Sequence, residues 1–182
     1  MEGHRIVSGR LDCPNCEDRH PIEGGIVRLV GAARTADTRS DPGTDASGRP
    51  ELAELSAALL GPPAGPEVLL VGPGLGSLAF PLAELRPEAW VISYAAPPAD
   101  SHERVHWVAP VPGAPLPIRS ARIHGVVLTG GVSLDLAEAA RVLVPGGRLL
   151  ILAPGPRVSQ AVVSAPIREL VADSRAWLGV RT

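Results

Sequence analysis

The sequence predicts an α/β protein built on a doubly wound, mostly parallel sheet. Three observations predict this fold. Short apolar segments alternate with helix-like segments from residue 50 onward. The apolar run Val68–Val71 leads into Gly72-Pro73-Gly74-Leu75-Gly76, a turn at which glycine permits positive φ and close approach of a ligand. The chain has 182 residues, 45% of them hydrophobic, which is enough for one sizeable core.

The composition excludes several classes of function. The formal net charge is −2 and no basic block is present, so we expect no nucleic-acid partner. All 17 basic residues are arginine, which excludes a Schiff-base lysine and a P-loop lysine. The sequence shows no hydrophobic leader and no apolar run near 18 residues, so we expect a cytoplasmic protein with no membrane contact.

Residues 1–33 predict a small β-rich appendage. Short strands are expected at Arg5–Val7 and on either side of the glycine pair in Pro21–Val30. Residues 34–49 contain no large apolar side chain and predict a flexible linker. The α/β domain is therefore expected over residues 50–182.

Each element of this domain has its own signal. Pro50 opens a helix that Gly61 and Pro62 end. A second helix is expected over 77–86, with a kink at Pro81 unless its first turn starts late. The other expected elements are strands at 67–71, Ala89–Tyr94, Val105–Val108 and Ile123–Leu128, a helix at Asp135–Leu143, a strand at Arg148–Ala153, a helix over 157–172 and a strand at Ala176–Val180.

Four landmarks resemble the class I S-adenosylmethionine-dependent methyltransferases. They are V-L-L-V-G-P-G-L-G at 68–76, A-P-L-P-I-R-S-A-R-I-H-G-V-V-L at 114–128, A-A-R-V-L-V-P-G-G-R-L-L at 139–150, and the order of these segments over roughly 50–155. The resemblance implies a Rossmann-like methyltransferase sheet. In that family a helix and a β-hairpin follow the last parallel strand. The tail of this chain after Ala153 is short for both, so we expect the sheet to be shortened at its C-terminus.

The resemblance further implies a cofactor site, from which this chain departs. Gly72, Gly74 and Gly76 would approach S-adenosylmethionine, and an acid after the second strand would hold its ribose. The chain places other residues where the family has acids, namely Leu70, Ser93–Ala96, Ala109-Pro110 and His124, the last near the adenine side. Losing the carboxylate–ribose contact costs roughly 2–3 kcal/mol, about two powers of ten in affinity.

These departures predict a methyltransferase-fold protein with a degenerate cofactor site. We expect a non-catalytic subunit that stabilises or positions a protein partner, or a homo-oligomer. The alternative is an active, divergent methyltransferase that acts on a small molecule and uses Tyr94 against the adenosine. A dinucleotide-binding protein is a third reading, but its ribose would need the same missing acid.

Cys13 and Cys16 have the spacing of half a zinc site. The segment from Leu11 to Leu29 resembles half of a zinc-ribbon-like domain that activates some methyltransferases, without the first cysteine pair of that domain. A standard zinc site needs four ligands, and the nearest further candidates, His4 and His20, form no standard zinc-finger pattern with the two cysteines. We therefore expect no bound zinc, with a zinc site at Cys13 and Cys16 as the alternative.

The other conspicuous side chains predict structure rather than chemistry. His102, His106 and His124 are read as satisfied core or surface histidines, with a general base or a set of metal ligands as the alternatives. Arg141 is expected to reach a helix end or a carboxylate. The three tryptophans, Trp90, Trp107 and Trp177, are expected to pack the sheet against helices or edges. A hydrolase triad is excluded because the sequence has no G-x-S-x-G turn.

Overall fold

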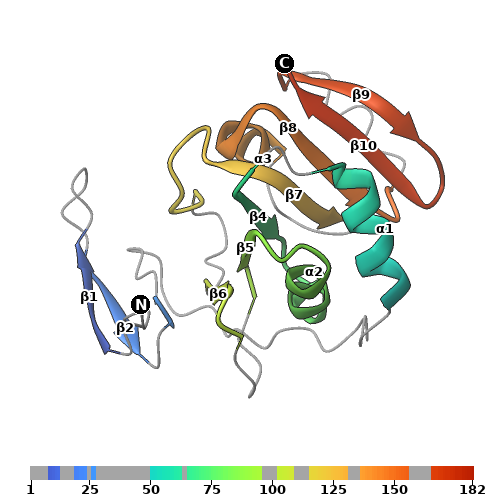
Figure 1. Ribbon diagram of the computed structural model, residues 1–182. Helices are drawn as coiled ribbons and strands as arrows, with labels where there is room; N and C mark the ends of the chain where they lie inside the picture. The colour runs from blue at the N-terminus through green and yellow to red at the C-terminus, as the bar shows by residue number, and fades with distance from the viewer. Residues whose placement is uncertain are drawn as a thin grey trace.

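The computed structural model describes residues 8–12, 19–23, 26–27, 50–62, 65–95, 102–108, 115–130, 136–155 and 165–182. They form an α/β unit and a small separate sheet near the N-terminus (Figure 1). The predicted strand at Arg5–Val7, the two cysteines and the predicted linker lie outside the described residues.

Seven strands form the main sheet, and their arrangement confirms the predicted fold class. Their order is β6-β5-β4-β7-β8-β10-β9. Strands β4 to β8 pair in parallel, whereas β10 is antiparallel to both β8 and β9. The strand order reverses between β4 and β7, the place where ligands bind in doubly wound sheets. The strands span Glu67–Val71 (β4), Ala89–Ser93 (β5), Val105–Trp107 (β6), Ile123–Thr129 (β7), Leu143–Leu152 (β8), Ile167–Ala172 (β9) and Ala176–Arg181 (β10).

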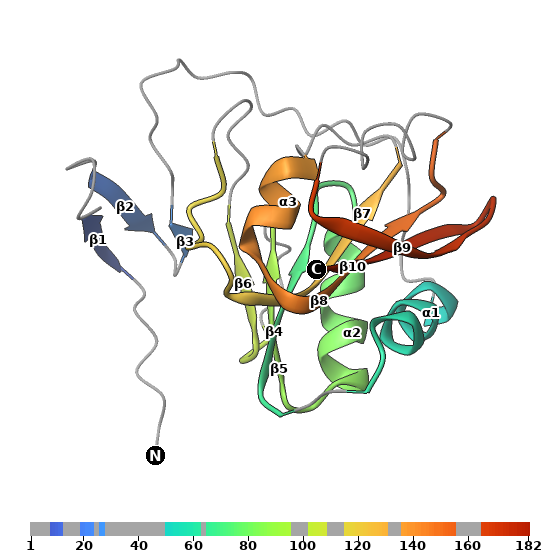
Figure 2. The ribbon, with the colours of Figure 1, turned by 90° about the horizontal axis from the view of Figure 1, so that it is seen from above.

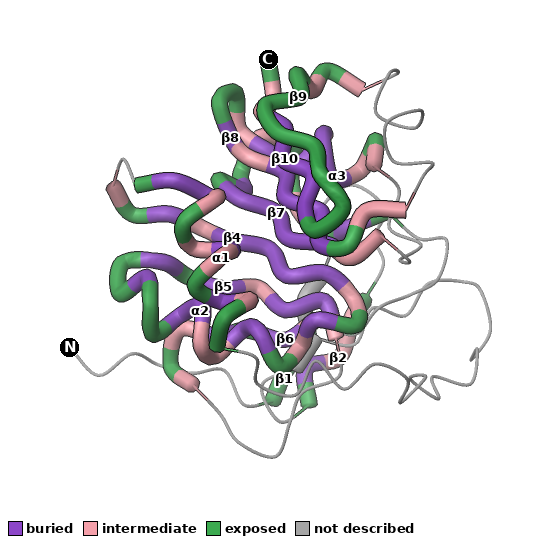
Figure 3. The backbone as a smooth tube through the Cα atoms, turned by 90° about the vertical axis from the view of Figure 1, so that its right-hand side faces the viewer, coloured by how far each residue is buried: buried purple, intermediate pink, exposed green. Residues whose placement is uncertain are grey.

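Helices cover both faces of this sheet (Figure 2). Helices α1 (Pro50–Leu60) and α2 (Ala79–Leu85) pack on one face, in a core cluster with Leu69, Val91 and Val127. Helix α3 (Leu136–Val142) packs on the other face. The central strands are largely buried (Figure 3). None of the helices among the described residues is long and apolar enough to cross a membrane.

Helix α2 begins later than predicted, and Pro81 explains why. Gly76–Leu78 form a 3-10 turn (η1), and the α-helix starts at Ala79. Pro81 therefore lies in the first turn, where a missing N–H breaks no intrahelical hydrogen bond. The helix has no need to kink there.

The prediction of a helix over 157–172 is wrong for its described part. Residues 167–172 form strand β9, which pairs with β10 and has a register shift beside Leu178. Ala, Arg, Glu and Leu favour helices, but strand pairing overrides this weak preference, and Pro166 excludes a helix interior. The β-hairpin expected to be missing from the short tail is thus present as β9 and β10.

The N-terminal sheet has three antiparallel strands, two of which confirm the short strands predicted on either side of the glycine pair. They are β1 (Ser8–Asp12), β2 (Arg19–Glu23) and β3 (Ile26–Val27), paired in that order. Strand β3 lies beside β6, the edge strand of the main sheet.

Candidate functional site

The glycine turn closes the carboxyl end of β4 and leads into η1. Gly72 N–H donates to the carbonyl of Val127 on β7, at 2.8 Å. A Cβ on Gly72 would lie 2.5 Å from Leu128 Cδ2, so the close approach of β7 requires glycine there. Gly74 has φ +77°, and no atom of the described residues lies within 4 Å of the place where its Cβ would be. The turn therefore has bare backbone that no described side chain covers, beside the strand switch point.

The third glycine contacts the ends of β5 and β6. A Cβ on Gly76 would lie 3.3 Å from Ala95 Cβ and 3.4 Å from the ring of Trp107. Ala95 follows β5 and points at the glycine turn. This is where a carboxylate on β5 would reach the turn, and alanine supplies none. From the sequence alone, the position that carries the family's acid could be any residue of Ser93–Ala96. The contact with Gly76 identifies this position as Ala95.

Tyr94 is placed differently from the ligand-stacking role predicted for it. Its side chain is 4% exposed and belongs to the core cluster that also contains Leu70 and Leu128. Its N–H donates to Val71 O at 2.8 Å, which extends the pairing of β5 with β4. Contact of Tyr94 with an adenosyl group stays a prediction.

The described residues that follow the parallel strands carry no charge. They are residues 72–77 after β4, 94–95 after β5, 108 after β6, 130 after β7 and 153–155 after β8, and Thr129 at the end of β7 is uncharged as well. At the end of β5, the hydroxyl of Ser93 is buried without a hydrogen-bond partner. Leu70, at the position of the family's acid before the first glycine, is fully buried in the core.

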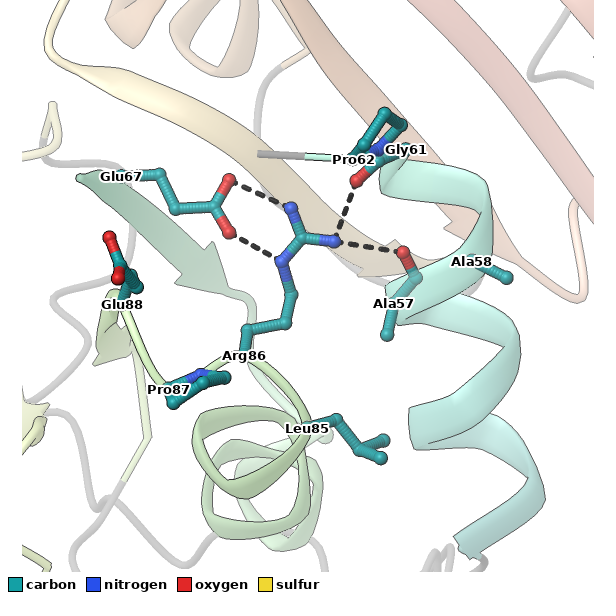
Figure 4. A pocket seen from close by; sticks show the side chains of 9 residues that line it. All are labelled: Ala57, Ala58, Gly61, Pro62, Glu67, Leu85, Arg86, Pro87 and Glu88. Carbon is teal, nitrogen blue, oxygen red and sulfur yellow. Dashed lines mark hydrogen bonds and ion pairs between the residues drawn. The ribbon is translucent and has the colours of Figure 1, made fainter. Parts of the chain in front are cut away.

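The charged cluster lies at the opposite, amino end of the sheet (Figure 4). There Arg86 donates to both carboxylate oxygens of Glu67, with 2.9 Å from Nη2 to Oε2. Its Nη1 donates to the carbonyls of Ala57 (2.9 Å) and Gly61 (2.7 Å) at the end of α1. A pocket of about 410 Å³ lies over this ion pair. Because both partners are engaged in joining α1, α2 and β4, the cluster is structural.

His124 is also remote from the glycine turn, which corrects its expected place near the adenine side. It lies near the start of β7, whereas the turn is at the carboxyl end of β4. Its Nδ1 accepts the N–H of Val68 at 3.0 Å, next to the first paired residues of β4 and β7. The satisfied-histidine reading of His124 is confirmed.

Arg141 has the structural role predicted for it. Its guanidinium donates to the Glu138 carboxylate at 2.8 Å and to the carbonyls of Ile118 (2.8 Å) and Leu116 (3.1 Å). Leu116 N–H in turn donates to Glu138 at 3.0 Å. The hydrogen bond from Arg141 lowers the pKa of Glu138, aided by Leu116 N–H and opposed by burial. Together the pair fixes the segment before β7 onto α3.

The lowered pKa of Glu138 gives a pH-dependent stability. Its contribution is complete above the ordinary value of 4.5 and is lost as the pH falls through the lowered pKa. We expect Glu138→Gln to lower the free energy of unfolding by about 1–2 kcal/mol at pH 7, and this difference from the wild type to shrink below pH 4.5. Urea unfolding at both pH values measures it. A difference that is constant with pH would contradict the assignment.

The three tryptophans do not share one role. Trp177 is fully buried, with Nε1 donating to Glu169 at 2.6 Å, and Trp107 meets the ring of Phe80 edge-on. Both confirm the packing prediction. Trp90 is 47% exposed and stacks on His106, with ring centroids 5.3 Å apart. Because His106 belongs to the edge strand β6, Trp90 packs at an edge of the sheet, and α2 packs on the other face of β5.

The zinc prediction is untested. Within the described ranges no three His, Cys, Asp or Glu side chains gather to hold a metal ion. Cys13 and Cys16 lie outside these ranges.

Comparisons with solved structures define the class of fold. The chain is similar to geranyl diphosphate C-methyltransferase from Streptomyces coelicolor A3(2), in a complex with S-adenosyl-L-homocysteine, at TM-score 0.56 and 15% identity. That match covers 72% of this chain and 76% of the other. It is also similar to a chain of a complex containing the Haloferax volcanii Trm112 methyltransferase activator, at TM-score 0.55 and 13% identity, over 71% and 88% of the two chains. No family model and no curated protein matches the sequence.

The protein therefore has the fold of the class I S-adenosylmethionine-dependent methyltransferases. At these identities the likeness establishes the fold alone. The residues at the described strand ends fit S-adenosylmethionine, the cofactor that this fold implies, only in part. The open backbone at Gly74 fits a ligand, but the described strand ends supply no carboxylate for a ribose.

Proposed function

We propose that this chain is a methyltransferase-fold protein with a degenerate S-adenosylmethionine site, and that it stabilises or positions a partner enzyme instead of transferring a methyl group. The observation that carries the proposal is the uncharged carboxyl edge formed by residues 72–77, 94–95, 108, 129–130 and 153–155. Charged side chains of the domain are engaged elsewhere, as in the Glu67–Arg86 pair.

The energetic argument rests on the ribose. A carboxylate that accepts both ribose hydroxyls makes two charge-assisted hydrogen bonds, which neutral backbone groups replace only in part. Losing them costs roughly 2–3 kcal/mol, or about a hundredfold in affinity. The glycine turn has a structural role that does not depend on a cofactor, because Gly72 joins β4 to β7.

A binding role is compatible with the exposed edge of the sheet. Strand β9 is the edge strand, and its Leu170 and Val171 are 39% and 45% exposed. Adjacent exposed aliphatic side chains on an edge strand are typical of surfaces that contact other chains.

The second candidate is an active, divergent methyltransferase. The open space in front of Gly74 favours it, since a ligand could be held there by backbone alone. Methyl transfer is an in-line displacement that depends mainly on positioning, so no particular catalytic side chain is required.

Purification of the tagged full chain from its native source tests the two candidates. We expect a stoichiometric complex whose partner unfolds at a lower temperature once the chain is removed. We expect this chain to transfer no methyl group. Gly74→Trp, which blocks the glycine turn, should therefore leave unchanged any methyl transfer that the complex shows with labelled S-adenosylmethionine. A free monomer, or labelling that Gly74→Trp abolishes, would contradict the proposal.

A further inference from the structure

Among the described residues, no helix packs over β5 and β6 on one face of the main sheet. Helix α2 packs against both strands on the face of Val91, Val105 and Trp107. Side chains alternate along a strand, so Trp90 and His106 point to the opposite face. There, Trp90 is 47% exposed and its ring is stacked on His106. Half of a large apolar side chain is thus open to water beside an edge strand.

The N-terminal unit has little apolar core of its own among its described residues. Of its residues whose exposure is described, 8–10 and 19–23, only Ile22 is buried. Units below about 40 residues need a disulfide, a metal or a partner surface for stability. Cys13 and Cys16 supply only two of the four ligands of a standard zinc site, and the spacing of these two cysteines closes no large loop.

The two incomplete surfaces are neighbours. Strand β3, at one edge of the small sheet, lies beside β6, the strand that carries His106. In Figure 2 the small sheet is beyond β6, on the side away from α1 and α2.

We propose that the N-terminal unit of this same chain docks on the Trp90–His106 face and covers it. Docking buries Trp90 and gives the small sheet the apolar support that it lacks. The occupant is the chain's own unit because β3 already contacts β6. The proposal goes beyond the proposed function and does not depend on whether S-adenosylmethionine binds.

Hydrogen exchange of the full chain, followed by mass spectrometry, tests this docking. Trp90→Ala should make residues 19–27 exchange about tenfold faster, since truncating a buried interface tryptophan costs at least this factor. Trp90→Phe should restore most of the protection. Leu85→Ala is the matched control, because Leu85 is also 47% exposed but lies on α2. It should leave residues 19–27 unchanged, and β4 and β7 should keep their protection in every variant.

Three results would overturn the proposal. The first is equal exchange of residues 19–27 in wild type and Trp90→Ala, or an equal change in Leu85→Ala. The second is protection that depends on protein concentration and accompanies a doubled mass in light scattering, since the unit would then dock on a second copy. The third is protection that EDTA removes but Trp90→Ala does not, since a metal would then hold the unit.

Discussion

Replacing Arg86 by methionine is expected to lower the free energy of unfolding by about 3–5 kcal/mol. Removing one partner of a buried ion pair leaves the other charge without compensation. Here the carboxylate of Glu67 would be left in a site where both side chains are less than 10% exposed. The carbonyls of Ala57 and Gly61 would also lose their donor. The loss is a large part of the 5–15 kcal/mol that stabilises a typical domain.

A double variant separates the charge from the packing. Glu67→Leu combined with Arg86→Met removes both charges, and buried pairs replaced by apolar side chains often lose little stability. We expect the double variant to recover most of the loss. Arg168→Met, at an exposed position on β9, is the control and should stay within about 0.5 kcal/mol of the wild type. Urea unfolding at pH 7 measures all three, and a double variant no more stable than Arg86→Met would contradict this assignment.

Introducing aspartate at Ala95 is expected to raise the affinity for S-adenosylmethionine about a hundredfold. Ala95 Cβ points at Gly76 in the turn, so a carboxylate there would reach the space in front of Gly74. Two charge-assisted hydrogen bonds to a ribose correspond to roughly 2–3 kcal/mol. Ala95→Asn is the matched control, because it has nearly the same shape without the charge.

Isothermal titration of the two Ala95 variants with S-adenosylmethionine gives the result. The Ala95→Asp variant should bind S-adenosylmethionine, and the Ala95→Asn variant should bind it far more weakly. S-adenosyl-L-homocysteine should show the same ratio between the variants, since the ribose is common to both ligands. Equal affinity of the two variants would show that the missing carboxylate is not what weakens the site.

The sequence was sufficient where pattern and local chemistry agree. The run Val68–Val71 and its glycines predicted β4 and the turn, because buried parallel strands are continuously apolar and the turn needs positive φ at Gly74. The R-V-L-V-P-G-G segment predicted the end of α3 to within one residue, but β8 begins at Leu143, five residues before the predicted Arg148, and includes Pro145-Gly146-Gly147. Arg141 was predicted to have a structural role because it belongs to this helix-end segment.

Long-range pairing set the limits of prediction. Residues 167–172 have helix-forming side chains, and only the presence of β10 makes them a strand. His124 was placed by analogy with an acid, whereas its imidazole completes a backbone hydrogen bond to Val68 from a segment 56 residues away. The Glu67–Arg86 pair has no sequence signature, since its partners are 19 residues apart and its two acceptor carbonyls belong to another helix.

The most direct test of the central claim is titration of the unmodified chain with S-adenosylmethionine. The chain should bind it about a hundredfold more weakly than Ala95→Asp does, because the turn is kept while the ribose has no carboxylate. A micromolar or tighter dissociation constant for the unmodified chain, unchanged in Ala95→Asp, would contradict the account.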